Sequence, residues 1–423
     1  MNIIVKKFLA EHGFYTDLNL PALTRDVLND MQARLSGKKS WQDMILTYIN
    51  PFKIEVSEKS VIVIDAGGTN FRSSLVTFSK DGTTSISNFE KTKMPGVEHE
   101  LSKKEFFNQI AKNLERFKDS YEEICFCFSY AMQITDEHDG ILKSFSKEVK
   151  APEVVGCKIG EELKKALKEN GWSKIPKVIL LNDTAAALLA GSGNKKYSSY
   201  IGFILGTGLN AAYVQSANSE FEISEPQIVV CESAKFGGFK NSDFDIILDE
   251  KSLNPTSSPF EKLCSGAYLG PLALETLQFA AKEKIFSGEF SKAISQRNSL
   301  SLLEVSSFLE NSFKEKAIYP KFDENANFKD SEIIFDIFDA LVNRMAQLAA
   351  VVLAACVLQC GEGKNPEKPI CIACNGTSFF KTYKVVERTK EYLAKILEGK
   401  NLYYEFLKEE VDITIGTAKA AFQ

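Results

Sequence analysis

A run of eight residues, Asp65-Ala-Gly-Gly-Thr-Asn-Phe-Arg72, has side chains suited to chemistry on a phosphate. Gly67 and Gly68 let backbone N–H groups approach phosphate oxygens, and Thr69 and Asn70 add further donors. The Asp65 carboxylate can hold hydrated magnesium, and the Arg72 guanidinium can neutralise phosphate charge. A plain hairpin turn is the alternative interpretation. The carboxylate at the strand end and the arginine beyond the glycines favour phosphate binding.

A second glycine turn, Gly206-Thr207-Gly208, is flanked by apolar runs at 200–205 and 210–215. This repeats the pattern of strand, turn and strand around Gly67, so we expect two phosphate-gripping hairpins, one per lobe, facing each other across a cleft. Such a turn alone is common in β-hairpins. Gly361-Glu-Gly-Lys364 lacks the spacing of a phosphate loop and is better interpreted as a helix-ending turn.

The segments that must position these turns alternate between strand and helix patterns, which predicts parallel strands with crossover helices. In the first half we expect strands at 60–65, 71–78, 84–89, 124–130 and 177–181 and helices at 103–117 and 159–170. Asn182-Asp183-Thr184 follows the last of these strands and precedes an alanine-rich run that favours a helix. Asp183 is therefore predicted at a strand end and a helix N-terminus, facing the cleft.

The beginning of the chain and its second half are expected to be mainly helical. Residues 21–36 have helical spacing and 41–48 continue the apolar lead-in; later helices are expected at 260–284, 300–313, 331–360, 382–397 and 413–422, with strands at 369–373 and 402–406. We expect a helical lead-in, 1–59, packed on the large lobe, a small lobe at 60–185, a large lobe at 186–410, and a C-terminal helix, 411–423, that returns to the small lobe.

Length and composition set outer limits on function. The 423 residues suit a two-lobed unit, and 51 basic and 56 acidic residues without blocks argue against nucleic-acid binding. Nine cysteines and three histidines without metal-ligand spacing argue against disulfides and zinc, which favours reduced thiols and a cytoplasmic protein. We see no signal peptide, and residues 348–357 are too few to span a membrane, so a buried core helix is expected there.

Motifs in family order make the chain similar to the hexokinase family, among the sugar kinases of the actin-like ATPase (ribonuclease H-like) fold. The matching stretches are 63–72, 126–130, 139–142, 145–147, 181–184, 206–210, Cys231-Glu232, Phe236-Gly237, 260–270, 375–377 and 416–421. This resemblance implies an α/β fold of two lobes, with mixed sheets flanked by helices and a central cleft. Departures from the family pattern occur at Ala131, Ser146, Ser233, Lys235 and Asn375.

The resemblance implies a role for each matching residue. Asp183 would be the general base, with Lys147 and Arg72 also catalytic. The hexose would be bound by Ser129, Ser146, Lys147, Asn182, Asp183, Asn210, Glu232 and Glu261. ATP would be bound by Asp65, Gly67, Gly68, Thr69, Asn70, Gly206, Thr207, Gly208, Gly376, Thr377, Gly416, Thr417 and Lys419, with Mg²⁺ held by Asp65 through water. Taken singly, Asn182 can instead cap a helix, Glu261 can lie in a solvated first turn, and Ser129 can be a core hydroxyl.

The implied activity is ATP-dependent phosphorylation of the 6-hydroxyl of glucose and other hexoses, the first step of glycolysis, by a monomer or homodimer. Neither a membrane nor a nucleic acid is expected as a partner. Two other hypotheses stay open: a sugar-binding regulator that has lost catalysis, and a different phosphotransferase or phosphohydrolase of the same fold. Retention of Asp183, Lys147 and Arg72 favours the enzyme, and the paired Glu232 and Glu261 disfavour an anionic substrate.

Overall fold

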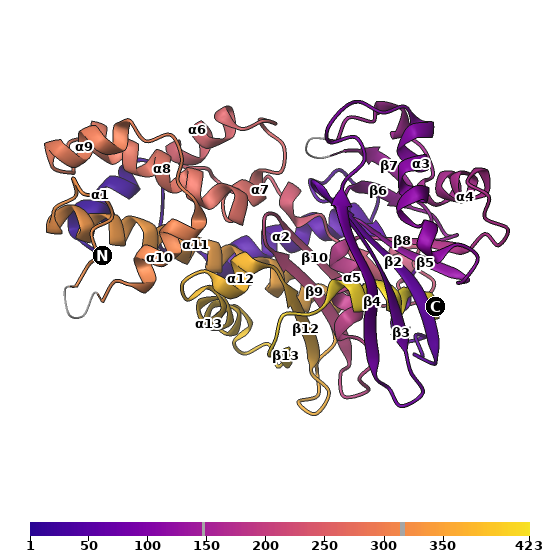
Figure 1. The fold of residues 1–423 in the computed structure, drawn as a ribbon. Helices are drawn as coiled ribbons and strands as arrows, with labels where there is room; N and C mark the ends of the chain where they lie inside the picture. Colours follow the sequence, from indigo (N-terminus) through magenta and orange to yellow (C-terminus); the bar gives the residue numbers. More distant parts are fainter. Residues whose placement is uncertain (146–148, 314–317) are drawn as a thin grey trace.

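The computed structural model describes residues 1–145, 149–313 and 318–423. In these ranges two mixed sheets and a hairpin are surrounded by helices (Figure 1). The strands are β1 Ile45–Leu46, β2 Lys59–Gly67, β3 Asn70–Phe78, β4 Thr84–Lys93, β5 Glu123–Phe128, β6 Ala131–Ile134, β7 Gly140–Ser144, β8 Lys177–Leu181, β9 Ser199–Leu205, β10 Leu209–Gln215, β11 Gln227–Val230, β12 Ile370–Asn375 and β13 Tyr404–Phe406.

Helices account for most of the remaining regular structure. They are α1 Ile3–Glu11, α2 Leu20–Leu35, α3 Lys103–Asn113, α4 Ile159–Glu169, α5 Asp183–Gly191, α6 Asp243–Lys251, α7 Pro259–Lys262, α8 Gly266–Lys282, α9 Gly288–Ser295, α10 Leu302–Glu310, α11 Phe328–Cys360, α12 Thr377–Lys381, α13 Val385–Leu397 and α14 Ile413–Lys419, with a 3₁₀ turn, η4, at Ser233–Lys235.

The two sheets share one topology. The first has the order β4-β3-β2-β5-β8, and the second has the order β11-β10-β9-β12-β13, with β1 added beside β11. In each, three antiparallel strands are followed by two parallel ones. A helix then follows the last strand, α5 after β8 and α14 after β13. The duplicated hairpin predicted from the glycine turns is confirmed, and the duplication extends over both whole sheets.

Strand β2 is a continuous apolar run because both of its faces are covered. Ile62 and Ile64 belong to one apolar cluster, which contains the inner face of α3, while Val61 and Val63 belong to another, which contains residues of α5 and α14. Successive side chains of a strand point to opposite faces, so two-sided cover requires an unbroken β-branched sequence. Strand β4 lies at the sheet edge and is exposed throughout, which suits its polar sequence.

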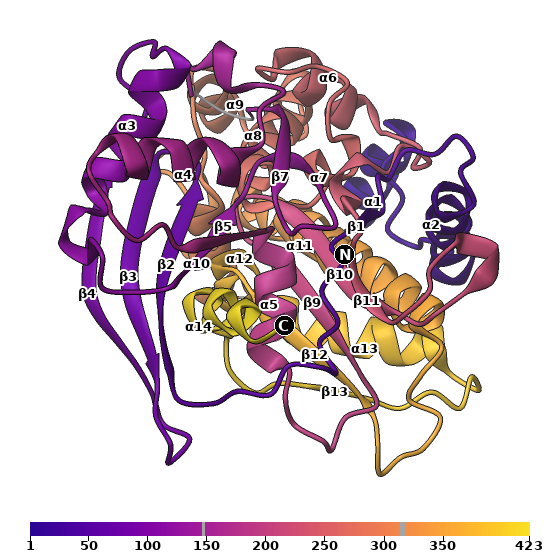
Figure 2. The ribbon, with the colours of Figure 1, turned by 90° about the vertical axis from the view of Figure 1, so that its right-hand side faces the viewer.

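Helices α5 and α14 pack against each other, and α14 also contacts β2, β3 and β5 of the first sheet (Figure 2). A Cβ atom on Gly416 would lie 1.9 Å from the carbonyl oxygen of Ala186, so glycine is needed for this close approach. The Lys419 ammonium donates to the carbonyl oxygens of Ala190 and Ser192, at 3.0 and 2.8 Å, where α5 ends. This contact joins the C-terminal residues to the helix that begins at Asp183.

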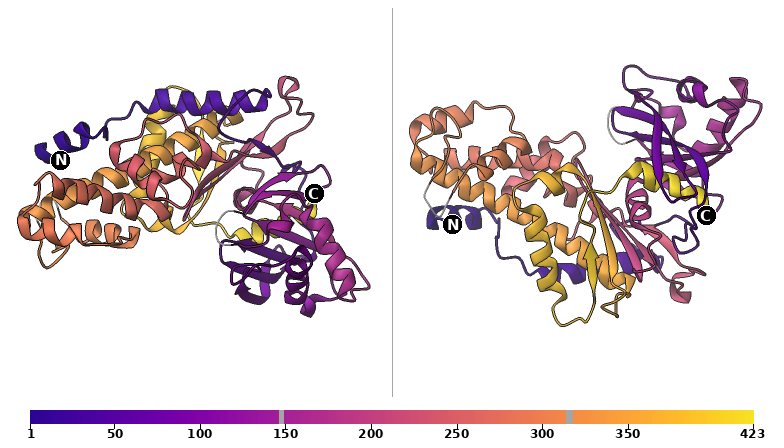
Figure 3. Two further views of the ribbon diagram at one scale, coloured as in Figure 1. Left: turned by 90° about the horizontal axis from the view of Figure 1, so that it is seen from above. Right: turned by 60° about the horizontal axis from the view of Figure 1, so that its bottom comes forward.

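Helix α11 is the core helix of the second half, packed among α2, α8, α13 and β10 (Figure 3). In the described residues it is long and apolar enough to cross a membrane, yet 89% of its most apolar window is buried inside the structure. The interpretation of 348–357 as part of a buried core helix is confirmed.

Two expectations about local structure were wrong. Residues 41–48 do not continue the helical lead-in: Ile45 and Leu46 form β1 and pair with Val230 and Val229 of β11. The expected helix at 260–284 is divided into α7 and α8, because Ser265 has extended backbone and precedes the start of α8. In addition, the hairpin β6–β7, strand β11 and helices α6 and α9 were not anticipated.

Candidate active site

The carboxyl ends of β2, β5 and β8 place two carboxylates at one edge of the first sheet. In the parallel register Asp65 lies opposite Cys127, and Cys127 lies opposite Leu181. Asp183 follows two residues later and is the first residue of α5, whose N-terminal Thr184 N–H is capped by the Asn182 side-chain oxygen at 2.8 Å. Negative charge is favoured at a helix N-terminus, so the fold provides a suitable place for the Asp183 carboxylate.

The first glycine turn is supported on both sides. Gly68 has a φ of 63°, a left-handed conformation that favours glycine, and its carbonyl accepts the Tyr130 hydroxyl at 3.0 Å. A Cβ on Gly67 would lie 3.0 Å from the Ser129 Cβ, so Ser129 lies directly beside the turn. Arg72 is the cross-strand partner of Asp65, and its Nη1 donates to Asp65 Oδ2 at 2.6 Å.

The second glycine turn is tied to Glu261 of α7. The Leu209 N–H donates to Glu261 Oε2 at 3.0 Å, and a Cβ on Gly208 would lie only 2.5 Å from the same oxygen. The carbonyl of Gly206 accepts from the Gly266 N–H at 2.8 Å, at the start of α8. The break between α7 and α8 thus brings Glu261 against the turn, whereas one continuous helix was expected there.

Glu232 lies just beyond β11 and next to Asn210 of β10. The Asn210 Nδ2 donates to Glu232 Oε1 at 2.9 Å, while its side-chain oxygen accepts from the Ala211 N–H at 2.8 Å. Glu232 has a φ of 57°, an unusual conformation for a residue other than glycine that often marks a functional site. The pKa of its carboxyl group is raised, because burial and the negative charges of Asp43 and Asp183 outweigh the Lys235 charge and the Asn210 hydrogen bond, which lower it.

Helix α5, which begins at Asp183, packs against β9, β10 and β11 of the second sheet. Burial raises the pKa of the Cys127 thiol well above its usual value, and the nearby charges of Asp65 and Asp183 raise it further. Since Asp183 also acts on Glu232, it lies within electrostatic range of both Cys127 on β5 and the residue that follows β11. Asp65, Asp183 and Glu232 therefore belong to one region, built by both sheets.

The residues expected near the nucleotide fall into two groups. Gly376 has a φ of 124°, and a Cβ on it would lie 2.4 Å from the Leu205 carbonyl oxygen, so its turn is adjacent to the Gly206 turn. Thr377 follows as the first residue of α12 and is exposed. Gly416, Thr417 and Lys419 instead have packing contacts at α5 and within α14, and their contact with a nucleotide stays a prediction.

Ser146 and Lys147 lie outside the described residues, so their predicted roles have no structural description. Three other residues were not anticipated at this site. Glu410 accepts the Gly376 N–H at 2.8 Å, and Lys235 pairs with Asp43 at 2.5 Å beside Glu232. From the sequence alone, Lys235 is only a departure from the family pattern. Motifs do not indicate these partners, because the contacts join segments far apart in the chain.

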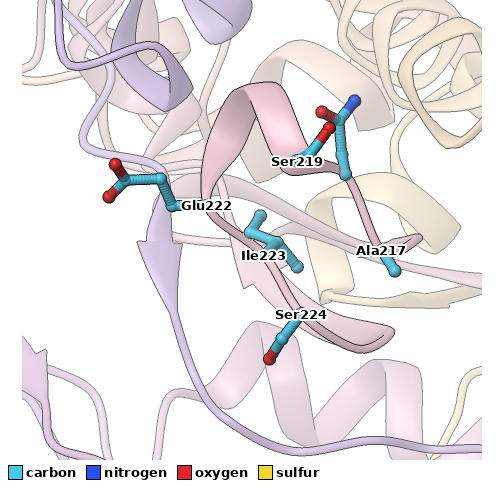
Figure 4. Close-up of a pocket in the computed structure, with 6 residues that line it drawn as sticks. Ala217, Ser219, Glu222, Ile223 and Ser224 are labelled. Atoms are coloured by element: carbon cyan, nitrogen blue, oxygen red, sulfur yellow. The ribbon is translucent and has the colours of Figure 1, made fainter.

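A separate hollow of about 490 Å³ lies at the loop that connects β10 to β11, away from these residues (Figure 4). It is open to solvent and lined by Ala217, Asn218, Ser219, Glu222, Ile223 and Ser224. None of the candidate residues within the described ranges lines it. The candidate site is defined instead by the contacts between the glycine turns and the carboxylates.

Comparison with known proteins identifies relatives along nearly the whole chain. Two family profiles, both described as hexokinase, match residues 5–192 and 200–423. Hexokinase-7 of Oryza sativa is 27% identical over 77% of this chain and 75% of its own length, and Hexokinase-1 of Spinacia oleracea is 26% identical over 87% and 80%. Hexokinase-1 of Bos taurus is 25% identical over 85% of this chain, which spans only 41% of that relative.

Solved structures resemble the whole fold. The hexokinase of Schistosoma mansoni, solved in complex with glucose, superposes with a TM-score of 0.80 at 22% identity and covers 99% of this chain and 98% of its own. Another hexokinase crystal structure has a TM-score of 0.77 at 19% identity, with 100% and 98% covered. These matches confirm the predicted two-lobed fold class.

Proposed function

The chain belongs to the hexokinase family, and from that premise we propose that it transfers the γ-phosphate of ATP to the 6-hydroxyl of glucose and of other hexoses. The observation that carries this proposal is the position of Asp183. Its carboxylate stands at the start of α5, within electrostatic range of the Asp65 strand end and of Glu232. A phosphate-binding turn and a polyol-binding carboxylate are thus near the same proton acceptor.

The proposed hexose contacts come mainly from the second sheet. Glu232 and Glu261 would accept hydrogen bonds from sugar hydroxyls, and Asn210, already bonded to Glu232, would orient that carboxylate. A polyol needs several directional partners to be held in one orientation, and each missing partner leaves a buried group unsatisfied. Ser129 and Asn182 would contribute from the first sheet, Ser129 beside the Gly67 turn and Asn182 beside Asp183.

Asp183 would take the proton of the 6-hydroxyl while that oxygen forms its bond to the transferred phosphorus. The bond to the departing ADP breaks in the same displacement, and the proton stays on the Asp183 carboxylate until it is released. Positioned proton transfer of this kind contributes about 10²–10⁴-fold in rate. Arg72, held by Asp65 at 2.6 Å, is placed to stabilise negative charge beside the first turn.

The residues present fit a magnesium nucleotide. The left-handed turns at Gly68 and Gly376 permit close approach of the backbone, and Asp65 provides a hard oxygen ligand. In the described ranges no group of three or more His, Cys, Asp or Glu could hold a metal ion, which suits an ion held through water and phosphate oxygens. ATP supplies the phosphoryl group, and Mg²⁺ neutralises charge on its phosphates. The Gly376 N–H is bonded to Glu410 and would have to exchange this partner to bind a phosphate.

Replacement of Asp183 by alanine tests the proposal. We expect kcat with magnesium-ATP and glucose to fall by about 10²–10⁴-fold, because the proton acceptor is lost. Glucose affinity should change by less than about tenfold, because Glu232, Glu261 and Asn210 remain. ADP release in a coupled assay gives the rate, and titration calorimetry gives the affinity.

Asp81→Ala, in the exposed turn between β3 and β4, is the matched control and should retain the wild-type rate. Near-normal turnover in Asp183→Ala would refute the assignment of the base. A wild-type chain that binds glucose but releases no ADP would instead indicate a sugar-binding regulator. Assays with glucose, mannose, fructose, N-acetylglucosamine and no sugar would define the substrate range.

A further inference from the structure

The surroundings of Glu232 disfavour the ionised carboxylate that its proposed role in hexose binding requires. A carboxylate that accepts hydrogen bonds from sugar hydroxyls must be ionised, since the protonated form loses acceptor capacity. Burial and the negative charges of Asp43 and Asp183 all oppose ionisation of Glu232. The Asn210 amide donates one hydrogen bond at 2.9 Å, but it is neutral. A positive charge close by would favour the ionised form.

Lys235 provides a cation in the same turn. Its backbone N–H donates to the Glu232 carbonyl at 3.0 Å, which closes the 3₁₀ turn η4 and fixes the two residues relative to each other. Its ammonium pairs with Asp43 Oδ2 at 2.5 Å, and both side chains are about two-fifths exposed. This contact comes from the segment before β1, which had been expected to be helical.

The segment that carries Asp43 is itself anchored. The Asp30 carboxylate of α2 accepts from the Trp41 and Gln42 N–H groups at 2.9 and 3.0 Å. The Arg34 side chain donates to the Asp43 carbonyl at 3.0 Å. Because its backbone is held in this way, Asp43 can fix the position of the Lys235 ammonium.

Other charged groups near Glu232 are already engaged. Helix α7 packs against η4 and carries Glu261, whose Oε2 accepts the Leu209 N–H, and Lys262, whose ammonium pairs with Asp249 and donates to the Asn254 carbonyl at 2.7 Å. Strand β10 contributes the neutral Asn210, and α5 contributes the negative Asp183. Among the described residues, the Lys235 ammonium is the cation that lowers the pKa of Glu232.

We propose that Lys235, held by Asp43, is a positioning residue of the hexose site that favours the ionised form of the Glu232 carboxylate, which Asn210 orients. This inference rests on the proposed function, because it assigns Glu232 to hexose binding. Lys235 touches neither the transferred phosphate nor Asp183 in this scheme. Its removal should therefore change hexose affinity at acidic pH and leave the chemical step largely unaffected.

Two substitutions that should shift the pKa of Glu232 in opposite directions test the proposal. In Lys235→Met the pKa of Glu232 rises, so at pH 5.5 the glucose dissociation constant should increase about three- to tenfold, while at pH 8 it should stay within about twofold of wild type. In Asp43→Asn a negative charge is removed and the side-chain oxygen can still accept from Lys235. The pKa of Glu232 then falls, so the loss of affinity in acid should begin at lower pH than in wild type.

Titration calorimetry of glucose between pH 5 and 8.5, with kcat measured over the same range, provides the data. Lys251→Met, which removes an ion pair with Glu275 away from this site, is the matched control and should follow the wild-type curve. The inference is supported if the pH dependence of glucose affinity shifts in opposite directions in the two variants while kcat stays within about twofold of wild type. Shifts in the same direction, or pH-independent losses, would show a merely structural contact and overturn it. Absence of glucose binding by the wild-type chain would overturn the proposed function together with this inference.

Discussion

Replacing Arg344 by methionine would test how the core supports the proposed hexose site. Arg344 of α11 forms a two-pronged ion pair with Asp245 of α6, with N–O distances of 2.8 and 2.6 Å. The two side chains are 3% and 2% exposed. A third bond, at 3.3 Å, runs from Arg344 Nη2 to the Leu263 carbonyl, two residues after Glu261. Arg344 therefore joins α11, α6 and the end of α7.

The expected loss of stability follows from this burial. Removing one partner of a buried pair leaves the other charge uncompensated and costs about 3–5 kcal/mol. Asp245 would keep its two contacts with Ser242, at 2.9 and 2.6 Å, which places the cost towards the lower end. With an unfolding entropy of about 2.1 cal/mol/K per residue, about 3–4 kcal/mol lowers Tm by about 3–5 °C for cooperative unfolding of the whole chain.

Urea unfolding followed by tryptophan fluorescence would give the change in free energy, and steady-state kinetics would give its functional effect. We expect the glucose KM to rise severalfold and kcat to change less, because Glu261 loses a neighbouring anchor. Arg297→Met, which removes a partly exposed pair with Glu304, with side chains 26% and 48% exposed, is the control and should cost less than about 1 kcal/mol. Equal losses in the two variants, or a cost below about 1 kcal/mol for Arg344→Met, would refute the reasoning.

Two further predictions concern the second glycine turn and helix α1. Gly208→Ala should raise the glucose KM at least about tenfold, because its Cβ would lie 2.5 Å from Glu261 Oε2 and displace that carboxylate; an unchanged KM would contradict the contact. Burial lowers the pKa of His12, but hydrogen bonds from its ring to Asp243 and Glu283, at 2.8 and 2.7 Å, outweigh burial and raise the pKa. The contribution of protonated His12 to the stability of the fold should therefore be complete below about pH 6.5 and be lost as pH rises through the folded-state pKa. Urea midpoints of wild type and His12→Gln should accordingly converge between pH 6 and 8.5, and a constant difference would contradict this.

Local patterns were sufficient where an element is determined by its own residues. The apolar run before Asp65, the glycines after it, and the alanine-rich segment after Asp183 each predict the observed structure directly. Strand β1 could not be found in this way, because Ile45 and Leu46 become a strand only by pairing with Val230 and Val229. Its neighbours Met44 and Tyr48 have positive φ angles, which helical spacing does not reveal.

The same limit applies to the site. Asp65, Asp183, Glu232 and Glu261 were found from their motifs, but Asp43 and Glu410 act through contacts with distant segments. Gly416 shows a second limit. In a sequence, a glycine required for close packing of two helices cannot be distinguished from a glycine required for a ligand turn. Only the position of Ala186 in the structure shows the packing contact.

The packing of α14 against α5, β2, β3 and β5 also limits how early the protein can finish folding during its synthesis. Strands translated in the first fifth of the chain have one apolar face that is covered by α5 and by residues of the C-terminal segment 413–422. While those residues are still inside the ribosome, Val61 and Val63 lack part of their permanent cover. Until they emerge, part of this apolar surface stays exposed to water, and transiently exposed surface of this kind favours aggregation.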